Sequence, residues 1–198
     1  MDRHEWDRRY SEAGFVWTTE PNRFVVAELA DLPPGRAIDL GAGEGRNAVW
    51  LAERGWKVTG VDFSEVGLAK AQALAEERGV EVEWVLADLR SFVPPPGSFD
   101  LVLIAYVQLP PAERTAVLHR AGEALRPGGT LLVVAHDLAN LTEGVGGPQN
   151  PEVLYTPQDV AADLAGLRVE RAERVRRPVE TPQGPREAVD TLVRAIRD

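Results

Sequence analysis

The stretch AIDLGAGEGRNAVWLAERGWKVTGVD, residues 37–62, decides how this chain folds. An apolar run ends in a glycine turn at 41–45, a short amphipathic segment follows, and a second apolar run ends at Asp62. Glycine has no Cβ, so such a turn bends tightly and lets a ligand lie against the backbone. The first amides of the following helix add a positive dipole end. The stretch therefore predicts a strand, a turn and a helix that bind one half of a nucleoside-containing cofactor.

Strands and helices keep alternating beyond this stretch, which predicts an α/β fold with a mostly parallel sheet covered by helices on both faces. Near-continuous apolar runs are typical of buried parallel strands. The expected strands are Ala37–Leu40, Lys57–Val61, Glu83–Leu86, Asp100–Ala105 and Thr130–Ala135. The expected helices between them are at about Gly45–Glu53, Glu65–Arg78 and Pro111–Leu125. Ser64 is placed to cap the second of these helices and Gly79 to end it.

Segments on either side complete a single domain. Residues 1–35 predict a helical cap, with helices around Glu5–Ser11 and Pro21–Ala30, ahead of a cofactor-binding core at 36–137. Residues 138–155 are rich in Gly, Pro and Asn, which predicts a mobile loop. Residues 156–198 predict a helix, Pro157–Leu164, and an antiparallel hairpin of Leu167–Arg176 and Ala188–Ile196. The expected sheet then has seven strands.

Composition limits the classes of partner. The chain has 198 residues, 44% of them hydrophobic, and no cysteine, so it has no disulfide framework and no thiolate metal site. No apolar stretch reaches the roughly 20 residues of a membrane span, and the charged start lacks a secretory pattern, so we expect a cytoplasmic protein. A net charge of −9 argues against nucleic acid as the main partner. The three histidines are scattered, so no metal site is expected, and the sequence gives no indication of oligomeric state.

Three features favour S-adenosylmethionine over a nicotinamide dinucleotide as the cofactor. Asp39 and Glu44 flank the turn, where carboxylates repel a pyrophosphate and attract a cofactor that carries an ammonium and a sulfonium. Asp88 ends the third expected strand, where a carboxylate can accept from an adenine amino group. The expected antiparallel ending departs from dinucleotide folds, which continue in parallel. Arg46 weakens the first argument, because it suits either a phosphate or a methionine carboxylate.

The chain resembles a known family in four motifs, DLGAGEGRN at 39–47, VDFS at 61–64, ADL at 87–89 and LRPGGTL at 125–131. These are similar to the successive motifs of class I S-adenosylmethionine-dependent methyltransferases. The GRN of the first motif, with WDRRY at 6–10, is similar to the subgroup of tellurite-resistance and thiopurine methyltransferases. The resemblance implies a Rossmann-like fold and S-adenosylmethionine as the methyl donor, with S-adenosylhomocysteine as its product.

The resemblance also implies which residues hold the cofactor. Asp39 and the backbone of the glycine turn would bind its methionine end, Asp62 the ribose hydroxyls, and Phe63 and Asp88 the adenine. An N-terminal aromatic often covers the cofactor in the subgroup, and Trp17 is placed for that role, although it also suits a plain core position. The full expected set is Trp17, Asp39, Gly41, Ala42, Gly43, Arg46, Asn47, Asp62, Phe63, Asp88, Leu89 and Ala105.

Candidate acceptor-side residues follow the fourth and fifth expected strands, where open α/β sheets bind ligands. Tyr106 follows the fourth strand, and His136 and Asp137 follow the fifth. His136 is a possible general base, or a structural residue that bonds backbone, and Asp137 would orient it or bind substrate. The sequence predicts methyl transfer to a small molecule through an S, N, O or chalcogen atom. An NAD(P)-binding oxidoreductase and a non-catalytic cofactor-binding protein remain as alternatives.

Overall fold

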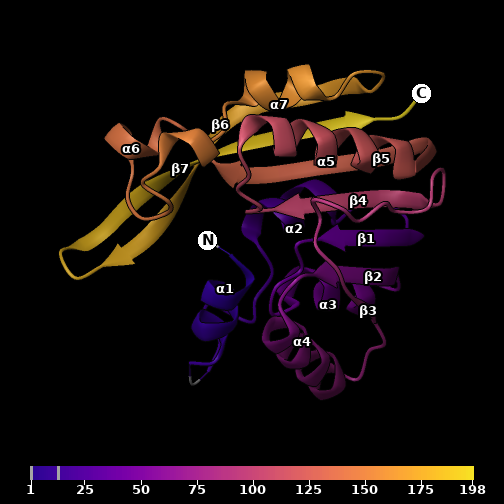
Figure 1. Ribbon diagram of the computed structural model, residues 1–198, viewed down its shortest axis with the longest axis horizontal. Coiled ribbons are helices and arrows are strands. Elements are labelled where there is room, and N and C mark those ends of the chain that lie inside the picture. Colours follow the sequence, from indigo (N-terminus) through magenta and orange to yellow (C-terminus); the bar gives the residue numbers. More distant parts are fainter. Residues whose placement is uncertain (1, 13) are drawn as a thin grey trace.

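The computed structural model describes residues 2–12 and 14–198 and contains one seven-stranded sheet (Figure 1). The strand order is β3 (Glu83–Leu86), β2 (Lys57–Asp62), β1 (Arg36–Leu40), β4 (Phe99–Ala105), β5 (Leu125–His136), β7 (Gly184–Ile196) and β6 (Arg168–Thr181). The first five strands in this order run parallel, whereas β7 is antiparallel to both β5 and β6. The predicted α/β architecture, a mostly parallel seven-stranded sheet that ends in an antiparallel hairpin, is confirmed.

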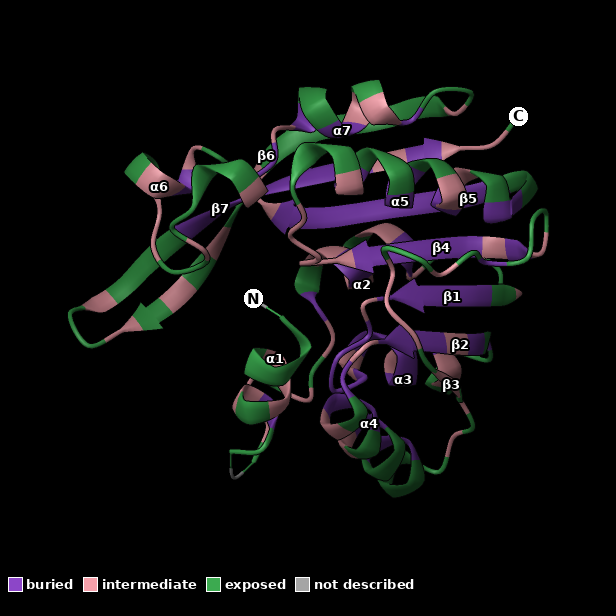
Figure 2. Cartoon of the chain, in the orientation of Figure 1, coloured by how far each residue is buried: buried purple, intermediate pink, exposed green. Residues whose placement is uncertain are grey.

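Helices cover both faces of the sheet. One face packs against α2 (Arg23–Leu29), α3 (Arg46–Glu53) and α4 (Glu65–Arg78), and the other against α5 (Pro111–Ala124) and α7 (Pro157–Asp163). A further helix, α1 (Arg3–Tyr10), lies against α4. Figure 2 shows the central strands almost wholly buried, as parallel strands with helices on both sides should be.

Local signals set the helix ends as expected. The Ser64 side chain accepts a hydrogen bond from the Gly67 amide at the start of α4, and Gly79 ends that helix with φ 67°. Helix α1 begins two residues before the expected range Glu5–Ser11 and ends one residue before its end. Helix α2 is shorter than the expected range Pro21–Ala30 at both ends. None of the described helices is long and apolar enough to cross a membrane.

The C-terminal hairpin is longer than predicted. Pro182 and Gln183 alone join β6 and β7, whereas the sequence suggested a gap from 177 to 187. Gly184, at φ 101°, closes the turn, and its carbonyl accepts a hydrogen bond from the Thr181 hydroxyl. Prolines made this region look like a loop, but Pro178 lies in the edge strand β6, where a missing N–H is tolerated. Pro182 is in the turn, and Pro185 lies where β7 pairs only with β6. In Figure 1 the far end of the hairpin projects beyond the carboxyl ends of the parallel strands.

The segment 138–155 contains two short helical pieces, α6 (Asn140–Glu143) and η1 (Pro151–Val153). The buried Asn140 side chain accepts from the Val189 amide of β7 at 2.7 Å, which ties this segment to the hairpin. The expected strand at Thr130–Ala135 also starts earlier, at Leu125, because Pro127–Gly129 forms an irregularity within β5 instead of a separate turn.

Candidate functional site

The glycine turn between β1 and α3 has a backbone that only glycine adopts without strain. Gly41, Gly43 and Gly45 have φ values of 88°, 55° and 85°. A Cβ on Gly41 would lie 2.3 Å from a methyl carbon of Val107, and one on Gly43 would lie 2.8 Å from the Tyr10 hydroxyl. The turn is therefore packed tightly from both sides, and it presents backbone instead of side chains to the carboxyl end of the sheet.

Asp39 is the most unusual residue near the turn. Its side chain is 1% exposed, and neither carboxylate oxygen has a hydrogen-bond partner. Burial, with a further contribution from nearby Asp62, outweighs the opposing effects of Arg46 and the Ala48 amide and raises the pKa of Asp39 to about 7. A buried carboxylate without a partner is unfavourable in a folded protein. This site therefore suits a ligand that brings a positive charge or a hydrogen-bond donor.

Arg46 carries the complementary charge at the start of α3. Its guanidinium is half-buried and forms no hydrogen bond or ion pair with any described residue. Burial lowers the pKa of Arg46, and the positive end of the α3 dipole is an unfavourable place for a cation. The turn thus has a carboxylate on its strand side and a guanidinium on its helix side that attract each other, but no hydrogen bond or ion pair joins them.

Glu44 does not take the role that its place in the turn predicted. Its buried carboxylate accepts from the amides of Val16 and Trp17, at 3.0 and 3.3 Å, and from Lys70 Nζ at 3.1 Å. The expectation that both Asp39 and Glu44 face a cationic cofactor is corrected for Glu44, because these donors already satisfy it. Glu44 instead ties the segment that follows α1 to the turn.

Two neighbours of the turn have defined contacts of their own. Asn47 is buried, and its side-chain oxygen accepts from the Asn22 amide at 2.9 Å. Ala42 is buried within the turn, and its carbonyl accepts from the Gly45 amide at 2.9 Å. Asn47 therefore ties the N-terminal segment to the start of α3, and Ala42 closes the turn itself.

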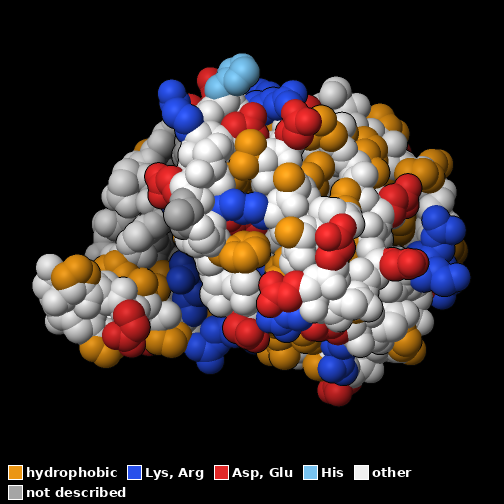
Figure 3. Space-filling model, turned by 90° about the horizontal axis from the view of Figure 1, so that it is seen from below, with side chains coloured by type: hydrophobic (Ala, Val, Ile, Leu, Met, Phe, Trp, Pro, Cys, Tyr) orange, Lys and Arg blue, Asp and Glu red, His pale blue; other side chains and the backbone are white. Residues whose placement is uncertain are grey.

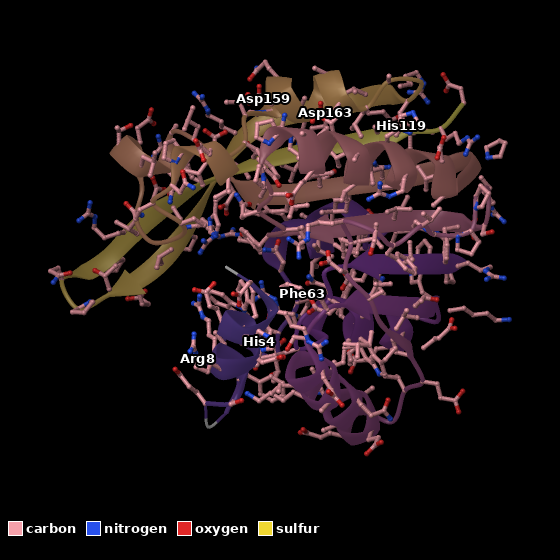
Figure 4. All side chains as sticks on the ribbon, in the orientation of Figure 1. His4, Arg8, Phe63, His119, Asp159 and Asp163 are labelled. Atoms are coloured by element: carbon pink, nitrogen blue, oxygen red, sulfur yellow. The ribbon has the colours of Figure 1, made fainter. Side chains whose placement is uncertain are left out.

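Asp62 lies at the end of β2 and braces the turn. Its two carboxylate oxygens accept from the amides of Gly43, at 2.8 Å, and Ser64, at 2.9 Å. Burial raises the pKa of Asp62, although these two hydrogen bonds act in the opposite direction. Each oxygen has a second lone pair beyond the amide that it accepts, so the carboxylate keeps capacity for further donors. Phe63, labelled in Figure 4, follows directly, and its side chain is partly exposed.

Helix α1 lies across this end of the sheet. The Ser64 hydroxyl donates to the Asp7 carboxylate at 2.5 Å, and the ring of Tyr10 is buried between Gly43 and Gly67. Trp17, the aromatic expected to cover the cofactor, is 46% exposed and stacks on Arg9 instead, 4.8 Å from the guanidinium carbon to the ring centre. Tyr10 is the N-terminal aromatic that lies on the turn.

Asp88 and Leu89 follow β3 at the next strand end. The Asp88 carboxylate accepts from the side chain of Arg90, at 2.6 Å for the shortest contact, and this hydrogen bond lowers the pKa of Asp88. Leu89 is partly buried, and its methyl carbon Cδ1 is near the Gly41 backbone. The sheet thus brings Asp39, Asp62 and Asp88 to one edge, because parallel strands end on the same side.

The acceptor-side residues meet beside β4 and β5. Ala105 ends β4, and Tyr106 follows it with φ 59°, a backbone region that costs about 1–3 kcal/mol for a residue with a side chain. This conformation directs the Tyr106 hydroxyl to Asp190 of β7, to which it donates at 2.8 Å. The Tyr106 and His136 rings lie 4.7 Å apart between centres. Gln108 accepts from the His136 amide at 3.0 Å.

The hydrogen bonds of the Asp137 side chain go to groups other than His136. Its carboxylate is fully buried and accepts from the Ala139 amide, the Arg174 guanidinium and the Thr191 hydroxyl, at 2.7 to 2.9 Å. The carboxylate beside His136 belongs instead to Asp190, which the sequence reading missed. The available signal was a single acidic residue inside the apolar run AVDTLV at 188–193.

A hollow of about 870 Å³ lies at the opposite edge of the sheet, among residues where β1, β2 and β3 begin, including Arg36 and Lys57. Open α/β sheets bind ligands at the carboxyl ends of their strands, so this hollow is a poor candidate for the site. On the face in Figure 3, acidic and basic side chains are interspersed, and no continuous basic stripe is visible among the described residues.

Comparison with known proteins agrees with this geometry. Residues 37–129 match the family described as a methyltransferase domain. The chain is 40% identical over 114 residues to demethylmenaquinone methyltransferase of Thermus thermophilus, a match that covers 57% of this chain and 52% of the relative. It is 37% identical over 127 residues to trans-aconitate 2-methyltransferase of Sinorhizobium medicae, covering 63% and 47%. The chain thus spans about half the length of these curated relatives.

The similarity of fold extends over more of the chain. A crystal structure of an S-adenosylmethionine-dependent methyltransferase from Methanosarcina mazei superposes with a TM-score of 0.67 and 18% sequence identity. The superposition covers 90% of this chain and 98% of the other. The arrangement of strands and helices is therefore shared beyond the segment in which the sequences are alike.

Proposed function

Because the family match, the relatives and the fold together support a class I S-adenosylmethionine-dependent methyltransferase, we propose that this protein methylates a small-molecule acceptor. The observation that carries the proposal is the pair of unpartnered charges at the glycine turn. The amino-acid end of S-adenosylmethionine has an ammonium that fits Asp39 and a carboxylate that fits Arg46. A dinucleotide would place a pyrophosphate near Asp39 and supply no cation for it.

The rest of the cofactor is assigned along the same sheet edge. The backbone of Gly41 and Gly43 would approach the methionine end, and the remaining lone pairs of Asp62 would accept from the ribose hydroxyls. Phe63 would pack on the adenine, and Asp88 and Leu89 would border its edge. Ala105 and Tyr106, at the end of β4, would lie next to the sulfur. When bound, S-adenosylmethionine supplies a methyl carbon activated by a positive sulfur.

The protein's own contribution is mostly positional. Methyl transfer is an in-line displacement, so the enzyme must hold the acceptor atom in line with the sulfur–methyl bond and exclude water. The residues available for this on the acceptor side are Tyr106, His136 and Gln108, all beside the carboxyl ends of β4 and β5. The strained backbone of Tyr106 is consistent with a constraint imposed by function.

A small-molecule acceptor fits the relatives and the charge of the chain. The names of several relatives specify small molecules, such as demethylmenaquinone and trans-aconitate, although ribosomal RNA and tRNA methyltransferases also occur among them. A net charge of −9 does not favour a nucleic-acid backbone. The likeness to the tellurite-resistance and thiopurine subgroup stays a proposal that rests on the GRN and WDRRY segments.

Replacing Arg46 with methionine tests the assignment of the methionine end. We expect S-adenosylhomocysteine to bind the R46M protein about 10- to 100-fold more weakly, because a charge-assisted hydrogen bond contributes roughly 1.5–3 kcal/mol. Methylthioadenosine, which lacks the amino-acid end, should bind both proteins equally. Titration calorimetry measures both ligands, with NAD as a control that should not bind. Equal weakening for both ligands would contradict the role given to Arg46.

The N-terminal segment and residues 138–155 are proposed to close over cofactor and acceptor. Tyr10 already lies on the glycine turn, and Gly147 lies against the His136 ring. We expect S-adenosylhomocysteine to slow hydrogen exchange in Arg3–Tyr10 and in 138–155, while strand residues 130–135 serve as the unaffected control. Unchanged exchange in both segments, at ligand concentrations that saturate calorimetry, would rule out the lid.

A further inference from the structure

The carboxylate of Asp190 organises three side chains from three strands of the sheet or their ends. It is fully buried, and its Oδ2 accepts from the Tyr106 hydroxyl at 2.8 Å and from Arg177 Nε at 2.7 Å. Its Oδ1 has no hydrogen-bond partner, yet it lies 3.3 Å from Nδ1 of His136. Asp190 and His136 are paired residues in the antiparallel register of β7 and β5, so the sheet itself sets this distance.

The contacts of His136 determine which ring nitrogen carries the proton. Nδ1 is buried and also lacks a hydrogen-bond partner, so Nδ1 and Asp190 Oδ1 are each other's available partners. The two atoms are close enough for a hydrogen bond but are not aligned for one, so a proton on Nδ1 pairs them after a small rotation of the ring. A proton on Nε2 instead leaves two acceptors facing each other. Nε2 is not among the buried unpartnered atoms, and the side chain is 12% exposed. The unprotonated nitrogen is therefore the one that remains accessible.

We infer that His136 and Asp190 form a proton-abstracting pair, and that the acceptor is a neutral small molecule with a weakly acidic O–H, N–H or S–H group. This inference rests on the proposed methyltransferase function and narrows its acceptor. An acceptor that is already an anion, or that carries no proton, needs no base. A buried imidazole oriented by a carboxylate is useful only where a proton must leave the acceptor during the transfer.

The step balances without any other reactant. Nε2 of His136 takes the proton of the acceptor, whose lone pair forms the bond to the methyl carbon. The bond from that carbon to the sulfonium breaks, and its electron pair stays on sulfur to give the neutral thioether of S-adenosylhomocysteine. The imidazolium that results lies beside Asp190 Oδ1, which stabilises its charge, and it returns the proton to water after product release.

The groups around His136 fit this role. Tyr106 lies against its ring and Gly147 covers it from the 138–155 segment. Arg177 of β6 bonds Asp190 and lies over the Tyr106 ring, 5.6 Å from the guanidinium carbon to the ring centre. The positive charge of Arg177 compensates the negative charge of Asp190. A second cation at His136 is therefore not required before the acceptor gives up its proton. Asp137, the next residue, bonds Arg174 and Thr191 instead.

The ring-nitrogen assignment is tested by nitrogen NMR of protein labelled with ¹⁵N-histidine. The chain has three histidines, and a His136→Gln variant identifies the signals of His136. At pH 8 we expect His136 to carry its proton on Nδ1, and the Asp190→Asn variant to lose most of this preference. The matched control is Asp137→Asn, an equally buried carboxylate beside His136 in sequence, which should keep it. A neutral imidazole with its proton on Nε2 in the wild type would overturn the inference.

The acceptor class is tested by S-adenosylhomocysteine release with phenols and thiols of graded acidity, and with iodide as a probe that carries no proton. His136→Gln and Asp190→Asn should lower kcat by about 10²- to 10⁴-fold for the least acidic probes, with little change in KM. The loss should shrink as the probe becomes more acidic, and high pH should restore activity as the probe ionises. Faster turnover of iodide than of every proton-bearing probe would overturn the inference.

Calorimetry with S-adenosylhomocysteine separates failure of this inference from failure of the proposed function. All three variants should bind S-adenosylhomocysteine as the wild type does, since none of the substituted residues lies at the glycine turn. If the wild type binds S-adenosylhomocysteine but His136 carries its proton on Nε2, the role of His136 as a base is refuted and the proposed function is not. Wild-type protein that does not bind it refutes the proposed function itself.

Discussion

Replacing Asp39 with asparagine is expected to stabilise the protein and, at the same time, to weaken its binding of S-adenosylhomocysteine. The wild-type carboxylate is buried without a hydrogen-bond partner, and burial raises its pKa from 3.8 to about 7. A difference of this size corresponds to a penalty on the order of 4 kcal/mol for the ionised form in the folded protein. Asparagine has no charge to desolvate, so the free energy of unfolding at pH 8 should rise by about 2–4 kcal/mol.

The pH dependence of the free energy of unfolding provides a separate test of this prediction. Between about pH 4 and 7 the folded protein holds a proton on Asp39 that the unfolded chain has released. Since the folded state then binds more protons, the stability contributed by this residue falls as pH rises through that range and is constant above it. The difference in free energy of unfolding between Asp39→Asn and wild type should therefore grow from pH 4 to 7. Urea denaturation at several pH values measures it, and a difference that does not vary with pH would contradict the assignment.

The affinity of the same variant for S-adenosylhomocysteine should fall. Loss of the carboxylate removes the proposed partner of the cofactor's ammonium, so we expect S-adenosylhomocysteine to bind about 10- to 100-fold more weakly. Methylthioadenosine has no ammonium and serves as the matched ligand, which should bind about as well as before. A stabilised protein with unchanged affinity for S-adenosylhomocysteine would mean that Asp39 has another purpose.

Asp62→Ala is expected to weaken both binding and folding. The Asp62 carboxylate accepts from the Gly43 and Ser64 amides, and its loss leaves two buried N–H groups without acceptors. Each such group costs about 1–3 kcal/mol, so the free energy of unfolding should fall by about 2–4 kcal/mol, although removal of a buried carboxylate offsets part of the loss. The variant will fold only if the wild type has that margin, which circular dichroism checks before any binding measurement.

The ligand pattern for Asp62→Ala should differ from that for Asp39→Asn. The ribose is common to S-adenosylhomocysteine and methylthioadenosine, so we expect both to bind at least about 100-fold more weakly. Asp62→Asn keeps one acceptor oxygen for a backbone amide and should be intermediate in stability. Wild-type affinity for methylthioadenosine in a folded Asp62→Ala protein would remove Asp62 from the ribose site.

Much of the fold was accessible from the sequence because its signals are local. The range Glu65–Arg78 of α4 was predicted to the residue, since Ser64 and Gly79 mark its two ends. The hairpin length was not predicted, because Pro178 and Pro185 carry the same local signal in a strand as in a loop. Tertiary structure makes them acceptable, since Pro178 lies in the edge strand β6 and Pro185 lies where β7 pairs with β6 but not with β5.

The candidate site, like the fold, was predicted from the sequence only where its signals are local. Asp39, Asp62 and the glycine turn were identified from their order along one stretch of chain, and parallel strands bring their ends to one edge. The different roles of Asp39 and Glu44 were not accessible, because the donors that satisfy Glu44 come from Val16, Trp17 and Lys70 in other segments.

By itself the sequence determined the order of strands and helices, the glycine turn and the carboxylates at the strand ends, because these depend on periodicity and on residues close together in the chain. The tertiary structure alone decided which charged groups lack partners. Asp190 lies beside His136, 54 positions earlier in the sequence, because the antiparallel register of β5 and β7 pairs the two residues. Sheet register is set by the packing of the whole domain, so no local pattern specifies such a contact.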